Sequence, residues 1–258
     1  MDPVIRGTCP FCLTTDSVLI NSHILPKWAY KRARQTNTPG NPNPVVVDVR
    51  KGKIIRTSRQ TSEAMLCAKC DQNLGRCDRW AAEALYQRNG TAPLLARGTR
   101  VARGYIILPE AEAGKLALFC LSVFWRAHLS RSMDVSLGTY AEGIRGFLHD
   151  SAPLPPEVAL VTFFHESAPN AGSILDTFFA QPVSSKNRGF FHHRFVLFGL
   201  DAVLGVGKLL RPEYHSLCIV KSNPRRLVLE HTEELINWMA EPVAGVIRRR
   251  RARGLPEV

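Results

Sequence analysis

The sequence contains no apolar run long enough to cross a membrane. Its longest apolar run covers residues 116–125, is interrupted by a serine and ends at Arg126, whereas a membrane-spanning helix needs about twenty apolar residues. The first three residues, Met-Asp-Pro, lack the basic start and the apolar core of a secretory signal. Internal repeats and extended low-complexity tracts are also missing from the sequence. These absences predict a cytoplasmic protein with no membrane partner.

Acidic residues are also in short supply. The 258 residues include 22 Asp and Glu against 34 Lys and Arg, so the formal net charge at pH 7 is +12. An excess of positive charge favours a polyanionic partner, and nucleic acid is the commonest such partner of an intracellular basic protein. We therefore expect the protein to bind nucleic acid, DNA in preference to RNA. The hydrophobic fraction of 45% is sufficient for a core, and the length allows two domains.

Cysteine is scarce, but four of the seven cysteines form two Cys-x-x-Cys pairs, Cys9/Cys12 and Cys67/Cys70. Two such turns supply the four thiolates of a tetrahedral structural Zn²⁺ site. A redox-active pair is an alternative, although that motif normally occurs once, at a helix start after a strand. Disulfides are a weaker alternative, because the cysteine number is odd and no secretory segment is present. We predict a structural zinc ion, and we expect the remaining cysteines to pack as small hydrophobic residues: Cys77, Cys120 and Cys218.

One histidine between the cysteine pairs suggests chemistry. His23 follows a short apolar run, residues 18–20, and precedes Ile24, Leu25 and Pro26, so we expect it at the end of a strand that the proline terminates. An imidazole there can take a proton from water at neutral pH if a neighbouring group fixes its tautomer. A single histidine beside apolar residues also occurs as a purely structural residue. We predict that His23 is a general base.

These motifs together resemble the zinc-bearing form of the HNH (ββα-metal, treble-clef) endonuclease family. The resemblance rests on Cys9-Pro-Phe-Cys12, on Ser22-His23-Ile-Leu-Pro26 and on Leu-Cys67-Ala-Lys-Cys70. It is closest to uncharacterised bacterial HNH-like proteins with a Ser-His-Ile-x-Pro motif, and it extends loosely over residues 5–150. A role in bacterial or phage defence fits that group.

The resemblance implies a role for each of three residues. His23 would activate water, and Asp71, directly after the last cysteine of the second pair, would bind a catalytic Mg²⁺ or Mn²⁺. Asp78 lies two helical turns farther on the same side, and it would join this metal site or support it from outside. The simpler alternatives are that Asp71 caps a helix and that Asp78 is a surface charge paired with Arg76 or Arg79.

The chain departs from the family pattern before the histidine. The family usually has Asp or Glu at that position, which supplies a second metal ligand, whereas this chain has Ser22, a poorer ligand for Mg²⁺. This difference supports the alternative that the protein is a catalytically inactive, zinc-stabilised module that binds nucleic acid or protein.

Two basic segments are candidates for contacts with phosphate. Residues 27–34 combine Lys and Arg with two aromatic side chains, Trp28 and Tyr30, and residues 45–56 read as a basic hairpin. Alternatively, the aromatic rings pack onto the zinc module while the charged groups stay in water. The residues that we expect to bind nucleic acid are Lys27, Arg32, Arg34, Lys51, Lys53 and Arg56.

The overall pattern predicts an α+β protein with three parts. Residues 1–104 form the treble-clef zinc module, residues 105–247 form a mixed helical and antiparallel-sheet domain that offers a surface for a protein partner, and residues 248–258 form a basic tail. We expect helices over residues 67–87, 110–131 and 136–149 and from residue 232, and strands over residues 105–108, 158–165, 174–180, 189–199 and 217–221.

Overall fold

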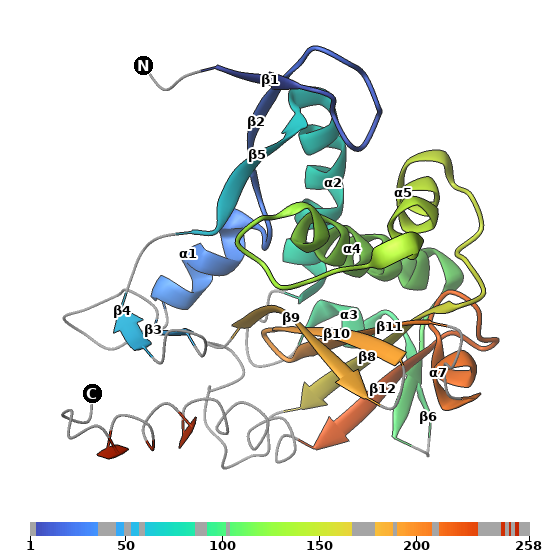
Figure 1. Ribbon diagram of the computed structural model, residues 1–258. Coiled ribbons are helices and arrows are strands. Elements are labelled where there is room, and N and C mark those ends of the chain that lie inside the picture. The colour runs from blue at the N-terminus through green and yellow to red at the C-terminus, as the bar shows by residue number, and fades with distance from the viewer. Residues whose placement is uncertain are drawn as a thin grey trace.

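The computed structural model confirms an α+β fold with helices and mixed sheets (Figure 1). It describes residues 4–35, 45–48, 53–56, 60–85, 92–101, 104–166, 179–187, 190–207, 212–231, 244–245, 248 and 251–252. The expected final helix from residue 232, most of the expected strand over residues 174–180 and most of the basic tail lie outside these ranges. No helix among the described residues combines the length and the apolar character that a membrane crossing requires.

The N-terminal module is a small sheet followed by a helix. Strands β1 (Ile5–Gly7), β2 (Ser17–His23) and β5 (Ser62–Cys67) form a three-stranded antiparallel sheet in the order β1-β2-β5. Helix α2 (Ala68–Leu85) begins directly where β5 ends. Between β2 and β5 the chain forms α1 (Lys27–Gln35) and the hairpin β3 (Val45–Asp48) and β4 (Lys53–Arg56). This order of elements places the cysteine pairs and His23 on one sheet-and-helix unit.

The rest of the chain is built on a seven-stranded sheet in the order β6-β7-β12-β8-β11-β10-β9. Neighbouring strands are antiparallel except for β8 and β12, which are parallel. The strands are β6 (Thr99–Val101), β7 (Tyr105–Ile107), β8 (Val158–Glu166), β9 (Phe179–Asn187), β10 (Phe190–Leu197), β11 (Leu200–Val206) and β12 (Arg226–His231). The helical elements are α3 (Pro93–Ala96), α4 (Glu110–Leu129), η1 (Gly138–Tyr140), α5 (Ala141–Asp150) and α7 (Pro212–Leu217).

Helix α4 joins the two parts of the molecule. It lies between α2 of the N-terminal module and the large sheet (Figure 1), and twelve of its residues, from Ala113 to Ala127, are buried. Phe119 and Phe124 contact the ring of Phe195 on β10, with ring centroids 6.2 Å and 5.1 Å apart. Burial of each such side chain contributes about 1.5–3 kcal/mol. A helix that is apolar on nearly every side therefore lies at the centre of the core.

The expected domain boundary after residue 104 does not separate two cores. Strand β6 lies before this position and pairs with β7 directly after it, so the hairpin of the large sheet spans the boundary. The buried hydrophobic residues form one cluster that runs from Cys9 to Leu227. Because α4 packs against both sides, the N-terminal module and the large sheet share their interior.

Two sequence expectations about strands need correction. Residues 217–221 are not a strand: Leu217 ends α7 and a turn follows, in which the N–H of Ile219 donates to the carbonyl of Leu160 on β8 at 2.9 Å. The run expected over residues 189–199 is only the first arm of a hairpin, whose second arm, β11, was missed. Phe198 and Gly199 both have positive φ, 49° and 90°, as a two-residue hairpin turn requires.

A carboxylate on β5 connects the N-terminal module to the end of α4. The Glu63 side chain accepts hydrogen bonds from the N–H groups of Arg131 and Ser132, both at 3.0 Å, and from the hydroxyl of Ser130. Burial favours the neutral acid, but these hydrogen bonds to the ionised form outweigh it and lower the pKa of Glu63 to about 2. The ionised carboxylate therefore stabilises the junction.

We expect the Glu63→Gln substitution to destabilise the protein by about 1–2 kcal/mol at pH 7, since the group is partly exposed to solvent. A depressed native pKa gives stability above the unfolded value of 4.5 that is lost as the pH falls towards 2. The stability difference between wild type and variant, measured by urea denaturation, should therefore shrink over this range. Comparison at each pH cancels effects shared by both proteins. A stability difference that does not change with pH would contradict this account. The control is Glu213→Gln on the exposed surface of α7, which should not show this pH-dependent difference.

Candidate zinc centre and histidine site

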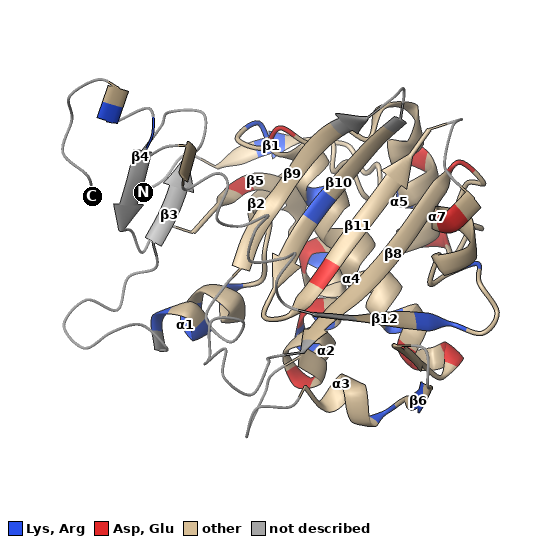
Figure 2. Ribbon diagram, turned by 90° about the horizontal axis from the view of Figure 1, so that it is seen from below, with Lys and Arg blue, Asp and Glu red and all other residues tan. Residues whose placement is uncertain are grey.

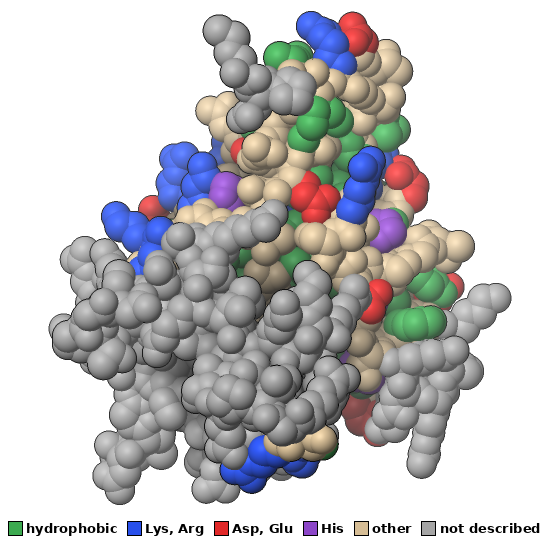
Figure 3. All heavy atoms as spheres, turned by 60° about the vertical axis from the view of Figure 1, so that its left-hand side comes forward, with side chains coloured by type: hydrophobic (Ala, Val, Ile, Leu, Met, Phe, Trp, Pro, Cys, Tyr) green, Lys and Arg blue, Asp and Glu red, His purple; other side chains and the backbone are tan. Residues whose placement is uncertain are grey.

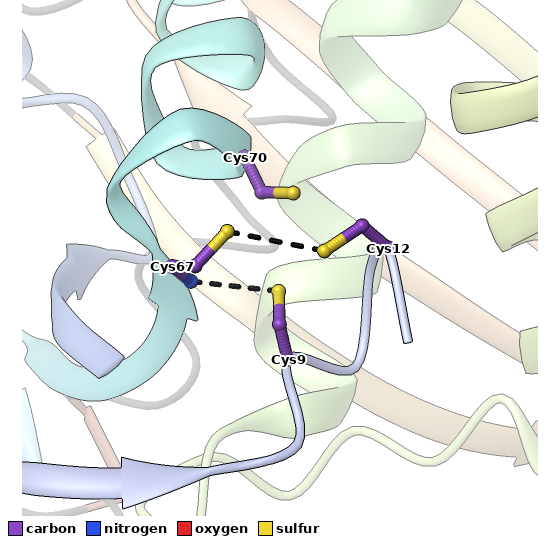
Figure 4. Close-up of side chains that lie close together, drawn as sticks. All are labelled: Cys9, Cys12, Cys67 and Cys70. Atoms are coloured by element: carbon purple, nitrogen blue, oxygen red, sulfur yellow. Dashed lines mark hydrogen bonds between the residues drawn. The ribbon is translucent and has the colours of Figure 1, made fainter. Parts of the chain in front are cut away.

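The structure brings the two cysteine pairs together. Cys9 and Cys12 lie in the loop after β1, Cys67 ends β5, and Cys70 lies in the first turn of α2 (Figure 4). Their four Sγ atoms lie within 4.8 Å of one another, and those of Cys12 and Cys67 are 3.9 Å apart. Tetrahedral zinc with Zn–S distances of 2.3 Å requires sulfurs about 3.8 Å apart. The cluster therefore has the composition and the spacing to hold a metal ion such as zinc.

The loop around the first pair is shaped by its own backbone. The N–H of Leu13 donates to the carbonyl of Cys9 at 2.8 Å, and the N–H of Cys9 donates to the carbonyl of Thr14 at 2.9 Å. Leu13 has a φ of 61°, a left-handed conformation that closes the turn and costs energy for a residue with a side chain. The N–H of Cys67 points at the Sγ of Cys9, 3.4 Å away. Such N–H groups stabilise negative charge on sulfur.

The electrostatics of the cluster also suit a cation. Hydrogen bonding of Cys12 with the Thr14 side chain, whose hydroxyl oxygen is 3.2 Å from Cys12 Sγ, and with the Thr14 backbone lowers the pKa of Cys12 to about 6. Burial, followed by the neighbouring cysteines, raises the pKa of Cys70. One thiol is thus readily ionised while another resists ionisation beside it, because burial disfavours its charged form and the neighbouring sulfurs add to this effect. A divalent ion removes this conflict and allows all four sulfurs to bind as thiolates.

His23 lies at the end of β2, where it pairs with Ser62 of β5, and its side chain is half-buried. Burial and the positive charge of Lys27 lower the pKa of His23, while a hydrogen bond with Gln60 and the charge of Asp71 act in the opposite direction. The imidazole is therefore mostly neutral at pH 7, the form that accepts a proton. Asp71, in the first turn of α2, is close enough to act on this imidazole electrostatically.

The structure excludes two of the three roles expected for Asp78, and the third, support of the metal site from outside, stays a prediction. Its carboxylate accepts hydrogen bonds at 2.8 Å and 2.9 Å from the guanidinium of Arg126, and the side chains of the pair are only 15% and 3% exposed. The backbone carbonyl of Asp78 also accepts a hydrogen bond from Trp28 Nε1 at 2.9 Å. Asp78 is therefore neither a surface charge paired with Arg76 or Arg79 nor a carboxylate free to bind a catalytic metal.

A second metal cluster is not found in the described part of the chain. There, the four cysteines are the only group of three or more Cys, His, Asp or Glu side chains with the spacing of metal ligands. Ser22 is fully buried and its hydroxyl donates to the carbonyl of Ile20 at 3.4 Å. Glu63, which lies opposite Ser22 in the β2–β5 pair, is bonded to the end of α4. Among the described residues, Asp71 is the carboxylate whose charge acts on the His23 imidazole.

The basic residues of α1, which are blue in Figure 2, differ in exposure. Lys27 and Lys31 are exposed and Arg34 is half-buried. Arg32 is only 5% exposed, and its guanidinium stacks on the ring of Phe198, 4.7 Å from the centroid. The expectation that Arg32 binds nucleic acid is therefore wrong.

The aromatic residues of α1 pack inside the molecule, between the large sheet and the N-terminal module: Trp28 also bonds to Asp78 of α2, and the Tyr30 hydroxyl accepts a hydrogen bond from the N–H of Thr61 at 3.4 Å. Trp28 contacts Phe198 with ring centroids 5.7 Å apart, and Tyr30 contacts Phe179 at 5.1 Å. Lys53 and Arg56 belong to β4, and Lys51 lies outside the described residues. In a space-filling view, Lys and Arg side chains lie at several separate places on the face shown, with Asp and Glu side chains beside some of them (Figure 3).

Two residues of the site were missed by sequence reasoning. Gln60 precedes β5 and bonds to His23, and Arg126 bonds to Asp78. No feature of the sequence around Gln60 predicts its contact with His23. The position of Arg126 could have indicated a buried partner, because it is a charged residue at the end of an otherwise apolar stretch.

The fold and the cluster define an α+β protein with a four-cysteine centre of the zinc type. No protein-family model, no curated protein and no solved structure matches the chain.

Proposed function

We propose that the protein is a metal-dependent, HNH-like endonuclease that hydrolyses phosphodiester bonds of nucleic acid. The observation that supports this proposal is the placement of His23 and Asp71 on one ββα unit. His23 ends β2, Asp71 lies in the first turn of α2, and the four-cysteine cluster joins β5, α2 and the loop after β1. A half-buried, neutral imidazole and a carboxylate that acts on it are the minimum equipment for activation of water beside a phosphate.

Each residue then has a defined task. The zinc-bound cysteines fix the sheet to the helix, so that His23 and Asp71 keep their relative positions. His23 takes a proton from the attacking water. Asp71 would hold a Mg²⁺ or Mn²⁺ ion, which, when bound, stabilises the charge that develops on the phosphate and on the leaving oxygen. Mg²⁺ in such sites commonly uses one or two carboxylates together with phosphate oxygens and water, so one carboxylate is compatible with this role.

A cleavage assay tests the proposal. Zinc-loaded protein is incubated with supercoiled plasmid, linear duplex DNA, single-stranded DNA and RNA, in the presence of Mg²⁺ or Mn²⁺ and with EDTA as the control. We expect nicking of at least one substrate that requires the added divalent ion. If fully zinc-loaded protein cleaves none of these substrates, the proposed activity is wrong.

The second candidate function is a binding module that keeps the zinc scaffold but does not cleave. The burial of Ser22 and the pairing of Asp78 with Arg126 favour it, because these positions do not then supply carboxylates to a catalytic ion. Calorimetry of Mn²⁺ binding to zinc-loaded protein separates the two functions. The nuclease requires a second binding event that Asp71→Asn weakens, whereas the binding module requires none.

The exposed basic residues of α1 give a prediction that applies both to a nuclease and to a module that only binds nucleic acid. We expect Lys31→Ala to weaken nucleic-acid binding and to reduce the slope of log K against log salt concentration by about 1, because one phosphate contact is lost. Arg32→Ala is the matched control: it should leave this slope unchanged and lower the stability by about 2 kcal/mol, since Arg32 packs inside the molecule. Fluorescence anisotropy over a salt series and thermal melts measure both effects. Equal losses of slope in the two variants would contradict this assignment.

A further inference from the structure

Arg126 is a charged side chain at the buried centre of the molecule. It belongs to α4, and its side chain is 3% exposed. Besides the two bonds to Asp78, the guanidinium donates to the carbonyl of Ser122 at 3.2 Å and to its hydroxyl at 3.3 Å. A further N–H of Arg126 donates to the backbone carbonyl of His23 at 3.0 Å. The guanidinium thus connects α4, α2 and the end of β2.

The hydrogen bond from Arg126 to the His23 carbonyl adds to the strand pairing between β2 and β5. The N–H of Ile24 donates to the carbonyl of Thr61 at 3.2 Å, so the neighbouring β5 side holds the backbone just after His23. The His23 carbonyl instead accepts a hydrogen bond from Arg126. Five residues farther on, Trp28 donates to the carbonyl of Asp78. The segment from His23 to Trp28 is therefore attached to the Arg126–Asp78 pair at both of its ends.

Stability alone does not explain this arrangement. A buried ion pair stabilises a fold no better, in general, than well-packed hydrophobic residues of similar volume. An ion pair with Asp78 also needs only two N–H donors of the guanidinium. The planar fork of arginine, unlike the single ammonium of lysine, can hold Asp78 and still direct another donor at the carbonyl of His23.

We propose that Arg126 is a positioning residue that sets the location of the His23 imidazole through the His23 carbonyl, with Asp78 holding the guanidinium in place. The catalytic consequence rests on the proposed nuclease function. A displacement of a catalytic group by about 1 Å can reduce a rate about 100-fold, so loss of this anchor lowers kcat without changing the affinity for nucleic acid.

The test uses the full chain loaded with zinc and labelled at its histidines with ¹⁵N. The ring resonances of His23 are assigned by their absence from His23→Ala. The charge of Arg126 itself contributes to the lowered pKa of His23, so the spectra are compared at a pH at which a titration shows the imidazole to be neutral in every variant. We expect these resonances to shift in Arg126→Met and in Asp78→Asn at that pH. The matched control is Arg194→Met, which removes another bidentate arginine–aspartate pair, with Asp201 in the large sheet, and should leave the His23 resonances in place. This measurement does not depend on activity.

Kinetics supply the second readout. Arg126→Met should lower kcat about 100-fold with KM for nucleic acid unchanged, and it should have no additional effect in the His23→Ala background, because the two residues act as a unit. Zinc content and melting temperature show whether Arg126→Met is folded. If Arg126→Met does not fold, the same measurements on Asp78→Asn test the proposal, since asparagine keeps the shape of the aspartate side chain.

Several results would overturn the proposal. His23 resonances that stay in place in folded Arg126→Met and Asp78→Asn show that Arg126 does not position His23. An equal shift in Arg194→Met shows that any lost buried pair disturbs the site. If the wild type cleaves nothing, the proposed function and the kinetic consequence are both wrong, and a shift confined to the first two variants still establishes the positioning role.

Discussion

Replacement of Cys70 by serine is expected to abolish zinc binding and to unfold the N-terminal module. The module consists of a three-stranded sheet with short strands, one helix and the loop after β1, and such small units depend on their metal. Structural zinc contributes about 10–16 kcal/mol of binding free energy in zinc-finger peptides, which is comparable to the total stability of about 5–15 kcal/mol of a native protein. Because α4 shares its core with the module, the loss should also lower the melting temperature of the whole chain.

Metal analysis and hydrogen exchange measure the effect of Cys70→Ser. We expect the wild type to bind one zinc ion per chain and the variant to bind none, with loss of amide protection in β1, β2 and β5. The control is Cys77→Ser, a half-buried cysteine on the same helix that lies outside the cluster. It should retain one zinc ion. The assignment of the cluster is wrong if Cys70→Ser retains zinc and normal protection.

The parts of the fold that depend on local patterns could be predicted from the sequence. The cysteine spacing predicted the cluster, because each Cys-x-x-Cys turn fixes its own two sulfurs and the short sheet brings the turns together. The hairpin β3–β4 and the helices α2 and α4 lie within a few residues of their expected positions. In each case the turn residues and the hydrophobic period are contained in the segment itself.

The partners of charged residues could not be predicted in this way. Asp78 has Arg76 and Arg79 beside it in the sequence, yet it pairs with Arg126, 48 positions away, because the packing of α4 against α2 brings that guanidinium to it. The parallel pairing of β8 with β12 is equally non-local. No pattern within either strand specifies its neighbour.

The spacing of residues in α1 could have been used to predict which of its basic side chains are buried. Trp28 and Arg32 are four residues apart, and both contact Phe198. Lys27 and Lys31 have the same spacing and are both exposed. Residues four apart share a face of a helix, so the position of the tryptophan indicates which arginine points inward. The phase of the helix, rather than its total charge, separates the candidate phosphate contacts from the core.

Replacement of His23 by alanine is expected to reduce cleavage by about 10²–10⁴-fold, the usual contribution of a general base. The reduction should occur in kcat, since His23 deprotonates water and does not bind the phosphate backbone in the proposed reaction. Zinc content should be unchanged, because His23 lies four residues along β2 from Leu19, the partner of Cys67. The stability should change little, because the side chain is only half-buried.

Two further variants separate the loss of a base from the loss of a side chain. His23→Gln keeps hydrogen-bonding capacity beside Gln60 but cannot accept a proton at neutral pH, so it should be as inactive as His23→Ala. His215→Ala, on the exposed surface of α7, should cleave as fast as the wild type. Single-turnover cleavage of labelled DNA with zinc-loaded proteins measures the rates. If His23→Gln retains the wild-type rate, the imidazole is not the base, and another group must activate the water.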